Sequence, residues 1–454
     1  GLYLTLTDKP GEQPAKAWRE AGIAPVELTG HWTMNGTAAA LHRRDKWLVS
    51  IVGMIKFWRG LEIYGWLQGN NYGRYARNGS IMVTAAGDPP SLEASGWAYD
   101  GWNWCHWPGT TSVVRPSSEI FDGYAMYTNP SAFAGGTNLQ GDGVFGMDFS
   151  SPDVSFRRSV FCFENRVTVL TTDIVSQQDR PTVTTLFQNT YDPQTEALRV
   201  GGDRESGAPC ETTIEAGEPC RLVDNKGTGY YVYPDHPPVR LRLGQQQWTY
   251  MIQRYLKDPT DNPIIDYQKR QYRHKDMEEN EQYFTPSTGT FALGYFEHGT
   301  KSTDGRCAYT MLIGATLEAL DSFATQMRAP ETAPCSLLRS DRAAHVLWDR
   351  ATDTTAYVLF ESTEDTGVPG SVRGVGRPCL VMARPDGDDL WLSVASTDIA
   401  NPEPIRLRLA GAWRLAEALD IEELPRVSHQ GADTSIELTY GSYMPMVLRL
   451  SAER

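Results

Sequence analysis

The stretch RVTVLTTDIV, residues 166–175, decides the fold class of this chain. It is rich in β-branched residues, and its apolar positions Val167 and Val169 alternate with polar ones, which is the period of a half-buried strand. The same pattern returns in TVTTLFQNTY (182–191), GTGYYVYP (227–234), PVRLRLG (238–244), TFALGYFEHG (290–299) and IELTYG (436–441). Turn sequences such as DNP, DGR and PDGDD separate these strands, so the chain predicts antiparallel sheets stacked as sandwiches.

Helical periodicity is scarce. Two short segments carry it: LEALDSFATQM (317–327), with apolar residues three and four apart, and WRLAEAL (413–419). A Tyr-rich and charged segment at 249–280 is interpreted as a long edge loop. We therefore predict an all-β protein, with a large antiparallel multi-sheet β-sandwich followed by a smaller C-terminal antiparallel β-sandwich.

The length of 454 residues is too great for one ordinary domain and predicts two or three. A Pro-bearing stretch, RAPETAPCS at 328–336, marks a boundary. We expect a central β-sandwich at 30–330 and a small one at 331–454. Residues 1–29 open on GLYLTLTDKPGEQ, which has the pattern of the tail of a preceding element and a linker.

A formal charge of −14 argues against general nucleic-acid binding, yet a local basic groove on an acidic body can still hold an anionic substrate. No apolar run has the length of a bilayer span. The seven cysteines show neither a CxxC motif nor zinc-finger spacing, and no carboxylate cluster has calcium-loop spacing. We predict no cofactor and no catalytic metal, and leave a structural cation open. Cys210 and Cys220 are either a disulfide or free thiols.

Three stretches carry candidate chemistry. The first runs from His42 to Gly79 and interleaves arginines, among them Arg43, Arg44 and Arg74, with aromatic residues. Guanidinium groups offer paired donors to carboxylate or sulfate, and aromatic faces stack on sugar rings. The alternative is an exposed sheet face with extended basic side chains.

The second stretch, GWAYDGWNWCHWPGTTSVV (96–114), concentrates aromatic residues in a loop. Trp102, Trp104 and His106 lie within it, and such loops suit carbohydrate platforms. The alternative is a hydrophobic plug that closes one end of the sandwich.

The third stretch, AFAGGTNLQGDGVFGMDF (132–149), contains five glycines, which bring the backbone close to a neighbour. Asn138, Gln140 and Asp142 project from it. A plain glycine-rich hairpin is the alternative.

Together these stretches resemble polysaccharide lyase family 8, and within it most closely the chondroitin sulfate ABC lyases. The resemblance rests on NGTAAALHRRDKWLVSI (35–51), EIYGWLQGNNYGRYARNG (62–79), GWNWCHWPGTTSV (101–113) and FAGGTNLQGDGVFGMDF (133–149). It is supported by TTLFQNTY (184–191), GTGYYV (227–232), FEHGT (296–300), YTMLIGAT (309–316) and RPCLVMAR (377–384). The similarity covers nearly the whole chain in order.

The family implies an N-terminal helical toroid, a large β-sandwich and a small C-terminal β-sandwich, of which this chain resembles the last two. It also implies β-elimination at a uronic acid of a glycosaminoglycan such as chondroitin sulfate, dermatan sulfate or hyaluronan, and a secreted or periplasmic protein. The family's proton-transfer His and Tyr belong to the helical domain, which becomes the expected partner. Neither nucleic acid nor a membrane is an expected partner.

Residue by residue, the resemblance assigns a catalytic role to Arg43 and to Gln140, which stands where these lyases carry a Glu. It assigns substrate binding to His42, Arg44, Arg74, Trp102, Trp104, His106 and Asn138. The amide of Gln140 lacks the carboxylate charge, so either Asp142 replaces it, or this branch manages without it, or catalysis is weak.

Two other functions remain open. The chain could be a non-catalytic carbohydrate-binding or structural module, which Gln140 favours. A hydrolase with Asp142 and Asp148 as its carboxylate pair needs both groups to face one sugar.

Overall fold

The computed structural model describes residues 17, 20–22, 28–58, 73–116, 119–120, 127–201, 205–206, 209–249, 286–398, 400–419, 423–439 and 443–453. Most of residues 1–29, predicted to be the end of a helical domain and a linker, and nearly all of the predicted loop at 249–280 lie outside these residues. The described chain is nearly all β, and every strand pair is antiparallel, as predicted.

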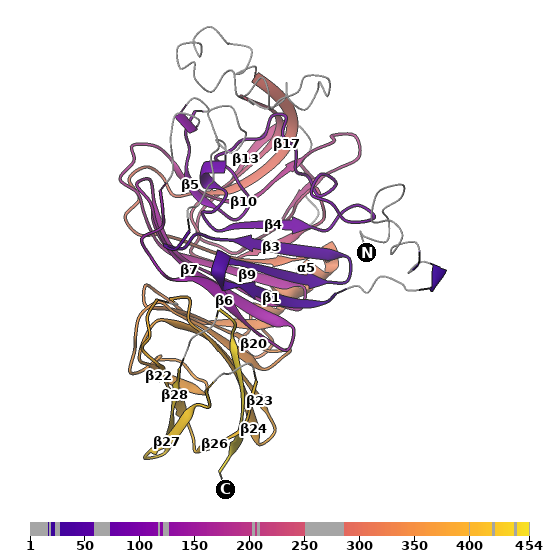
Figure 1. Cartoon of the computed structure of the whole chain (residues 1–454). Coiled ribbons are helices and arrows are strands. Elements are labelled where there is room, and N and C mark those ends of the chain that lie inside the picture. Colours follow the sequence, from indigo (N-terminus) through magenta and orange to yellow (C-terminus); the bar gives the residue numbers. More distant parts are fainter. Residues whose placement is uncertain are drawn as a thin grey trace.

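Three sheets form the larger part of the molecule (Figure 1). A four-stranded sheet has the order β1 (Gly30–Met34), β2 (Ala39–Arg44), β3 (Trp47–Val52) and β4 (Ser80–Thr84), with a short 3-10 turn η2 (Asn35–Thr37) after β1. A five-stranded sheet has the order β13 (Cys210–Ile214), β16 (Val239–Thr249), β17 (Pro286–Glu297), β10 (Thr182–Thr190) and β5 (Thr111–Val113).

A nine-stranded sheet packs against both of these sheets. Its order is β12 (Glu205–Ser206), β11 (Leu198–Val200), β14 (Cys220–Val223), β15 (Gly229–Val232), β18 (Gly305–Leu312), β9 (Arg166–Val175), β8 (Ser155–Phe163), β7 (Asp142–Ser150) and β6 (Ala134–Leu139). One buried apolar cluster joins the three sheets, including Ile51 of β3, Phe145 of β7 and Phe296 of β17.

Two further sheets follow in the chain and form the smaller, yellow-to-orange part of Figure 1. One has the order β19 (Cys335–Ser340), β20 (Ala344–Asp349), β21 (Thr354–Leu359), β23 (Cys379–Asp386), β24 (Asp389–Ala395), β29 (Met446–Ala452) and β26 (Trp413–Leu419). The other has the order β22 (Val372–Val375), β25 (Ile405–Ala410), β28 (Asp433–Leu438) and β27 (Arg426–Gln430). A separate apolar cluster fills the space between them.

The two parts of the molecule share a third apolar cluster, which contains Phe161 of β8 and Val358 of β21. Polar contacts cross the same boundary. The ring of His345 on β20 contacts Ser159 Oγ at 2.8 Å and Thr172 Oγ1 at 3.0 Å, and Thr137 Oγ1 lies 2.7 Å from Ser393 Oγ. The small sandwich therefore packs directly on the nine-stranded sheet.

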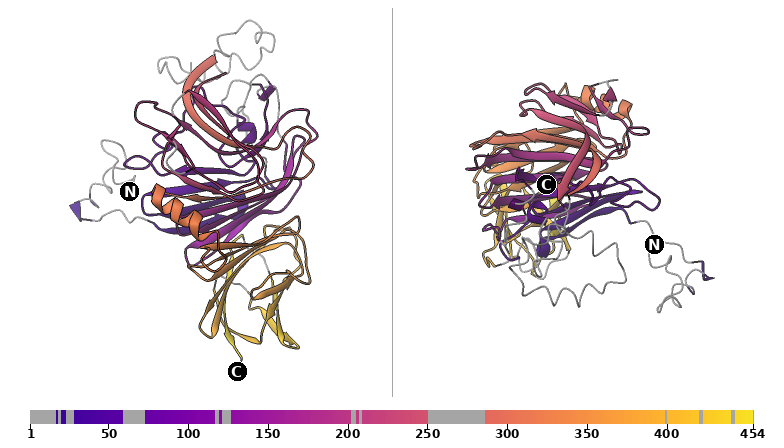
Figure 2. Two further views of the ribbon diagram at one scale, coloured as in Figure 1. Left: turned by 180° about the vertical axis from the view of Figure 1, so that it is seen from behind. Right: turned by 90° about the horizontal axis from the view of Figure 1, so that it is seen from above.

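Helix α5 (Leu317–Gln326) confirms the first helix prediction. The side chain of Thr316 caps it by accepting from the Ala319 N–H at 3.2 Å, and its buried face packs on β14 and β15 (Figure 2, left view). No helix among the described residues is long and apolar enough to cross a membrane.

The second helix prediction is wrong, since Trp413–Leu419 is strand β26. The pairing of β26 with β29 shifts register between Leu415 and Glu417. This bulge lets Trp413, Leu415 and Ala418 all pack on the C-terminal core, at spacings of two and three. A bulged strand thus imitates the apolar spacing of a helix.

All seven cysteines are free thiols in the structure. Cys210 lies on β13 and Cys220 on β14, which belong to different sheets. The question left open by the sequence is settled in favour of free thiols here.

Candidate functional site

Strand β2 sends neighbouring residues to opposite faces of the four-stranded sheet, because side chains alternate along a strand. Ala40 and His42 are fully buried toward the nine-stranded sheet, whereas Leu41 and Arg43 lie on the other, outer face and are half-buried. Arg44, two residues after His42, lies on the same inner face as Ala40 and His42. The predicted arginine pair is therefore split between the two faces.

Arg44 is held by the hairpin of β6 and β7. Its Nη2 donates to Asp142 Oδ1 at 2.6 Å and to the Gly141 carbonyl at 3.0 Å, and its Nε lies 3.8 Å from Glu164 Oε2. Burial raises the pKa of Asp142 to about 6, against the opposing effects of the Glu164 N–H and Arg44. The side chain of Arg44 is 15% exposed, so in this conformation it serves chiefly as a clamp between β2 and the hairpin.

Arg43 lies on the outer face, with Gly30 of β1 and Leu48 of β3 as its cross-strand neighbours. The indole of Trp32 covers Gly30, where a Cβ would stand 3.2 Å from the ring. Trp32 and Met34 of the same face are 38% and 39% exposed. The outer face is thus an apolar surface with a guanidinium beside it.

Gln140 occupies the tight turn between β6 and β7. Gln140 and Gly141 have φ angles of 49° and 90°, the positive values of a two-residue type I′ hairpin turn. The Gln140 side chain is exposed, and Asn138, which pairs with Gly143, is half-buried. The bond from Arg44 to the Gly141 carbonyl places this turn next to the end of β2, and the catalytic role of Gln140 stays a prediction.

His42 is fully buried, and its Nε2 donates to the Glu164 carbonyl at 2.8 Å. Burial lowers the pKa of His42 to about 4, partly offset by this bond, so the ring is neutral. It offers no surface to a substrate in this conformation. The assignment of His42 to substrate binding stays a prediction, and the burial of its side chain argues against that role.

The tryptophan loop is also buried. Trp102 and Trp104 are 0% and 4% exposed and pack in a cluster with Phe291, in which the Trp102 and Trp107 rings lie 5.8 Å apart. His106 is 4% exposed, with its Nδ1 3.1 Å from Thr185 Oγ1. These side chains are buried against β17, and their role as substrate ligands stays a prediction that needs the loop to open.

Arg74 belongs to a partly buried ionic network. Its Nη2 donates to Asp153 Oδ2 at 2.9 Å, Arg115 donates to Asp153 Oδ1 at 2.6 Å, and the Tyr75 hydroxyl donates to the same carboxylate at 3.0 Å. These contacts hold the Arg74 guanidinium inside the protein. The other aromatic and basic residues of its motif, at 59–72, lie outside the described residues.

The hydrolase alternative fails on geometry. Asp142 and Asp148 lie six residues apart on the single strand β7, which separates them by about 20 Å, whereas a catalytic pair stands about 5–9.5 Å apart. Asp142 is bound to Arg44, and Asp148 lies 3.6 Å from Arg157.

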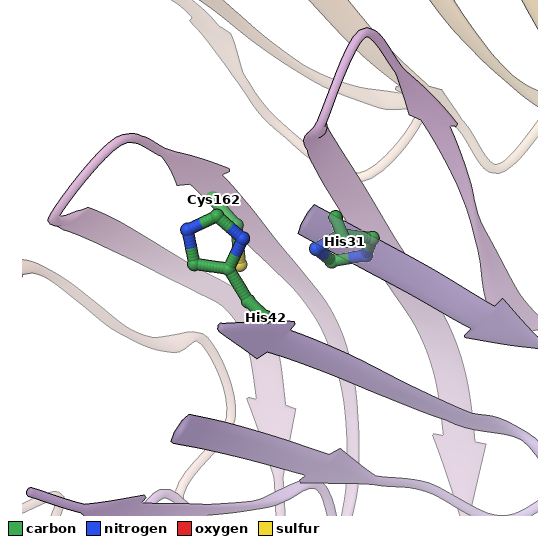
Figure 3. Close-up of side chains that lie close together, drawn as sticks. All are labelled: His31, His42 and Cys162. Atoms are coloured by element: carbon green, nitrogen blue, oxygen red, sulfur yellow. The ribbon is translucent and has the colours of Figure 1, made fainter. Parts of the chain in front are cut away.

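One cluster escaped sequence reasoning. His31 of β1 and Cys162 of β8 face His42 in the interior (Figure 3). The alternation of buried and exposed residues along β1 and β2 could have indicated that His31 and His42 lie on the same buried face of the sheet. The pairing of that face with β8 has no local signature.

Comparison with known proteins identifies a family and several relatives of this chain. Residues 29–324 match the model of the polysaccharide lyase family 8 super-sandwich domain. The chain is 25% identical to the chondroitin sulfate ABC endolyase of Proteus vulgaris, over 99% of this chain and 42% of that enzyme.

Two solved structures share the fold. A Paenibacillus xanthan lyase superposes with a TM-score of 0.75 at 17% identity, over 97% of this chain and 39% of that one. A Streptomyces coelicolor chondroitin AC lyase in complex with chondroitin sulphate superposes with a TM-score of 0.70 at 15% identity, over 98% and 52%. The chain spans about two-fifths of the length of the curated relatives that it matches.

Proposed function

The protein belongs to polysaccharide lyase family 8, and we propose that it is the β portion of a glycosaminoglycan lyase that cleaves uronic-acid polymers by β-elimination. Three of its relatives are chondroitin sulfate ABC lyases, from Proteus vulgaris and Bacteroides thetaiotaomicron. The proposal extends their substrate class to this chain. The proton-transferring His and Tyr would come from a helical domain outside these 454 residues.

The observation that supports this function best is the position of Arg43. β-Elimination removes the weakly acidic C5 proton of the uronate, so negative charge accumulates on the carboxylate as the transition state forms. A guanidinium on the outer face of the sheet can donate paired hydrogen bonds to that carboxylate or to a neighbouring oxyanion. Arg44, tied to Asp142 at 2.6 Å, fixes the strand that carries it.

The outer face also supports a docked partner domain. Trp32 and Met34 are more than a third exposed beside Arg43. Exposed apolar side chains that lie together on one face of a sheet can be covered by a docked domain. A helical domain seated there would close a groove over Arg43 and exclude water from the reacting sugar.

Gln140 sets the expected strength of catalysis. It sits at the exposed turn beside Arg44, where an acidic side chain would add a negative charge. The amide keeps the length and the hydrogen-bonding groups without that charge. We propose that this substitution weakens orientation of the cationic groups and leaves the carboxylate of the substrate less repelled.

The test is an ultraviolet assay for the unsaturated uronate product on chondroitin sulfate and hyaluronan. The chain is assayed alone and joined to a family 8 helical domain. We expect product only from the joined protein, and its loss in Arg43→Ala. The exposed cation Lys46 of the following turn provides the matched control, since Lys46→Ala should leave the rate within about twofold. Full activity in Arg43→Ala would remove the guanidinium from the reaction.

A non-catalytic carbohydrate-binding module is the second candidate, and Gln140 is the observation that favours it. It predicts quenching of tryptophan fluorescence by chondroitin sulfate, with the exposed Trp32 and Trp58 as reporters, and no unsaturated product from the joined protein. Product formation would decide for the lyase.

A further inference from the structure

Three side chains that can ligate a metal converge between the four-stranded and nine-stranded sheets. They are His31 of β1, His42 of β2 and Cys162 of β8. Their ligand atoms all lie within 4.8 Å of one another, and Figure 3 shows the His42 ring in front of Cys162 with the His31 ring beside them. No other such group of three occurs among the described residues.

The imidazoles are placed by strand pairing. His31 and His42 are directly opposite each other in the β1–β2 ladder, with ring centroids 5.5 Å apart. Cys162 lies opposite Gly143 in the β7–β8 ladder. The ring of His31 rests on Gly143, where a Cβ would stand only 2.2 Å from its Cδ2. Gly143 therefore makes the room that lets the His31 ring reach over β7 toward Cys162.

The nitrogen atoms of this cluster lack the partners that a structural histidine has. His31 is 3% exposed, yet neither of its ring nitrogens has a hydrogen-bond partner. His42 uses its Nε2 on the Glu164 carbonyl, which leaves the buried Nδ1 as a bare lone pair. The buried His345 shows the ordinary arrangement, with both nitrogens bonded to hydroxyls. Buried nitrogens without partners are costly, so the cluster is incomplete as a purely structural one.

We propose that His31, His42 and Cys162 bind one zinc ion, which pins the four-stranded sheet to the nine-stranded sheet. Two imidazoles and a thiolate supply three donors of the kinds that zinc favours, and a water molecule would fill the fourth tetrahedral position. Tetrahedral zinc with these ligands needs ligand atoms about 3.4–3.6 Å apart, so modest rotamer changes close the gap from the present spacing of up to 4.8 Å. The Glu164 carbonyl orients the His42 ring, as an outer partner of a metal-bound imidazole does.

The surrounding charges fit the ion. Burial lowers the pKa values of both histidines, so each ring keeps a neutral, ligating nitrogen. Burial raises the pKa of the Cys162 thiol, and zinc would displace its proton on binding. The nearby cation Arg44 is neutralised by Asp142 at 2.6 Å. The cluster lies on the opposite face of β2 from Arg43.

The test measures metal in the 454-residue chain. The purified chain is dialysed against a weak chelator, and its metal content is determined. We expect one zinc per chain, lost in Cys162→Ser and in His31→Gln. Cys307→Ser provides the matched control, because Cys307 is also a buried thiol, on β18 of the same sheet. No stoichiometric metal, or equal loss in the control, would overturn the proposal, and copper in place of zinc would overturn the choice of metal.

A second measurement does not depend on a variant that folds. Wild-type chain stripped with a strong chelator is titrated with Co²⁺ and with Zn²⁺. Co²⁺ should produce a thiolate charge-transfer band in the near ultraviolet, and Zn²⁺ should abolish it and raise Tm by roughly 5–10 °C. The absence of both the band and the Tm shift would overturn the proposal.

Discussion

Acid should weaken the packing of the small sandwich on the large one through His345. The ring is fully buried between Ser159 and Thr172, whose hydroxyls are satisfied by its neutral form. Burial lowers the pKa of His345 from 6.5 to about 3, a change that nearby Arg157 reinforces and Asp341 opposes. The unfolded chain therefore binds a proton between these two values that the folded chain does not bind.

The sign and size follow from this difference. The stabilisation is fully present above the unfolded pKa of 6.5 and is lost progressively as the pH falls toward 3. Between pH 7 and pH 4.5 the loss at this one site is about 2.5 kcal/mol, because each pKa unit is worth about 1.36 kcal/mol.

The assay is urea unfolding of wild type and His345→Gln at both pH values. The variant loses hydrogen bonds at pH 7, which costs about 1–3 kcal/mol. Its free energy of unfolding should then fall by about 2.5 kcal/mol less than that of wild type on going to pH 4.5. His429→Gln, on the exposed edge strand β27, controls for the loss of a histidine as such. Equal pH dependence in wild type and His345→Gln would refute the reasoning.

Three further predictions test the site. Arg44→Ala leaves the Asp142 carboxyl buried without its 2.6 Å partner and should lower the free energy of unfolding by about 1.5–3 kcal/mol in urea melts, whereas an unchanged stability would show that the clamp is unimportant. Trp102→Ala should lower the free energy of unfolding by about 3–5 kcal/mol, because the ring is fully buried. Loss of glycan binding at unchanged stability would instead show that Trp102 belongs to a carbohydrate-binding platform. Gln140→Glu in the joined protein should raise the elimination rate about tenfold, an effect of roughly 1.4 kcal/mol on the barrier, and a rate that falls would show that the amide is adapted to this enzyme.

The strands were predictable because the buried and exposed faces of a strand produce an alternation of apolar and polar residues in the local sequence. Residues 166–175 alternate at period two and form β9 with the same bounds. The same logic failed at Trp413–Leu419, where the bulge in β26 changes the apolar spacing from two to three. The spacing of apolar residues reports which positions of an element are buried. A bulge changes this spacing, although the element remains a strand.

The site was only partly predictable. The resemblance identified the stretches that contain Arg43 and Gln140, and the turn geometry places Gln140 beside the end of β2. Burial was not predictable from aromatic density, since the same tryptophans serve a platform or a plug, and Trp102 turned out to be fully buried. Which face of a loop is covered depends on strands far away in the sequence, here on Phe291 of β17.

Strand β2 connects the separate proposals physically. Its inward residues are all committed to the interior: Ala40 to the apolar core, His42 to the cluster with Cys162, and Arg44 to Asp142. Each of these contacts joins β2 to the nine-stranded sheet, so together they fix the strand against sliding or rotation. Because side chains alternate, fixing that face also fixes the direction of Arg43 on the other one. The His-Arg-Arg sequence of a half-buried strand is thus explained by the strand's two faces: the neutral His42 and the paired Arg44 anchor the inner face, and Arg43 is left on the outer face, where the proposed function needs a cation.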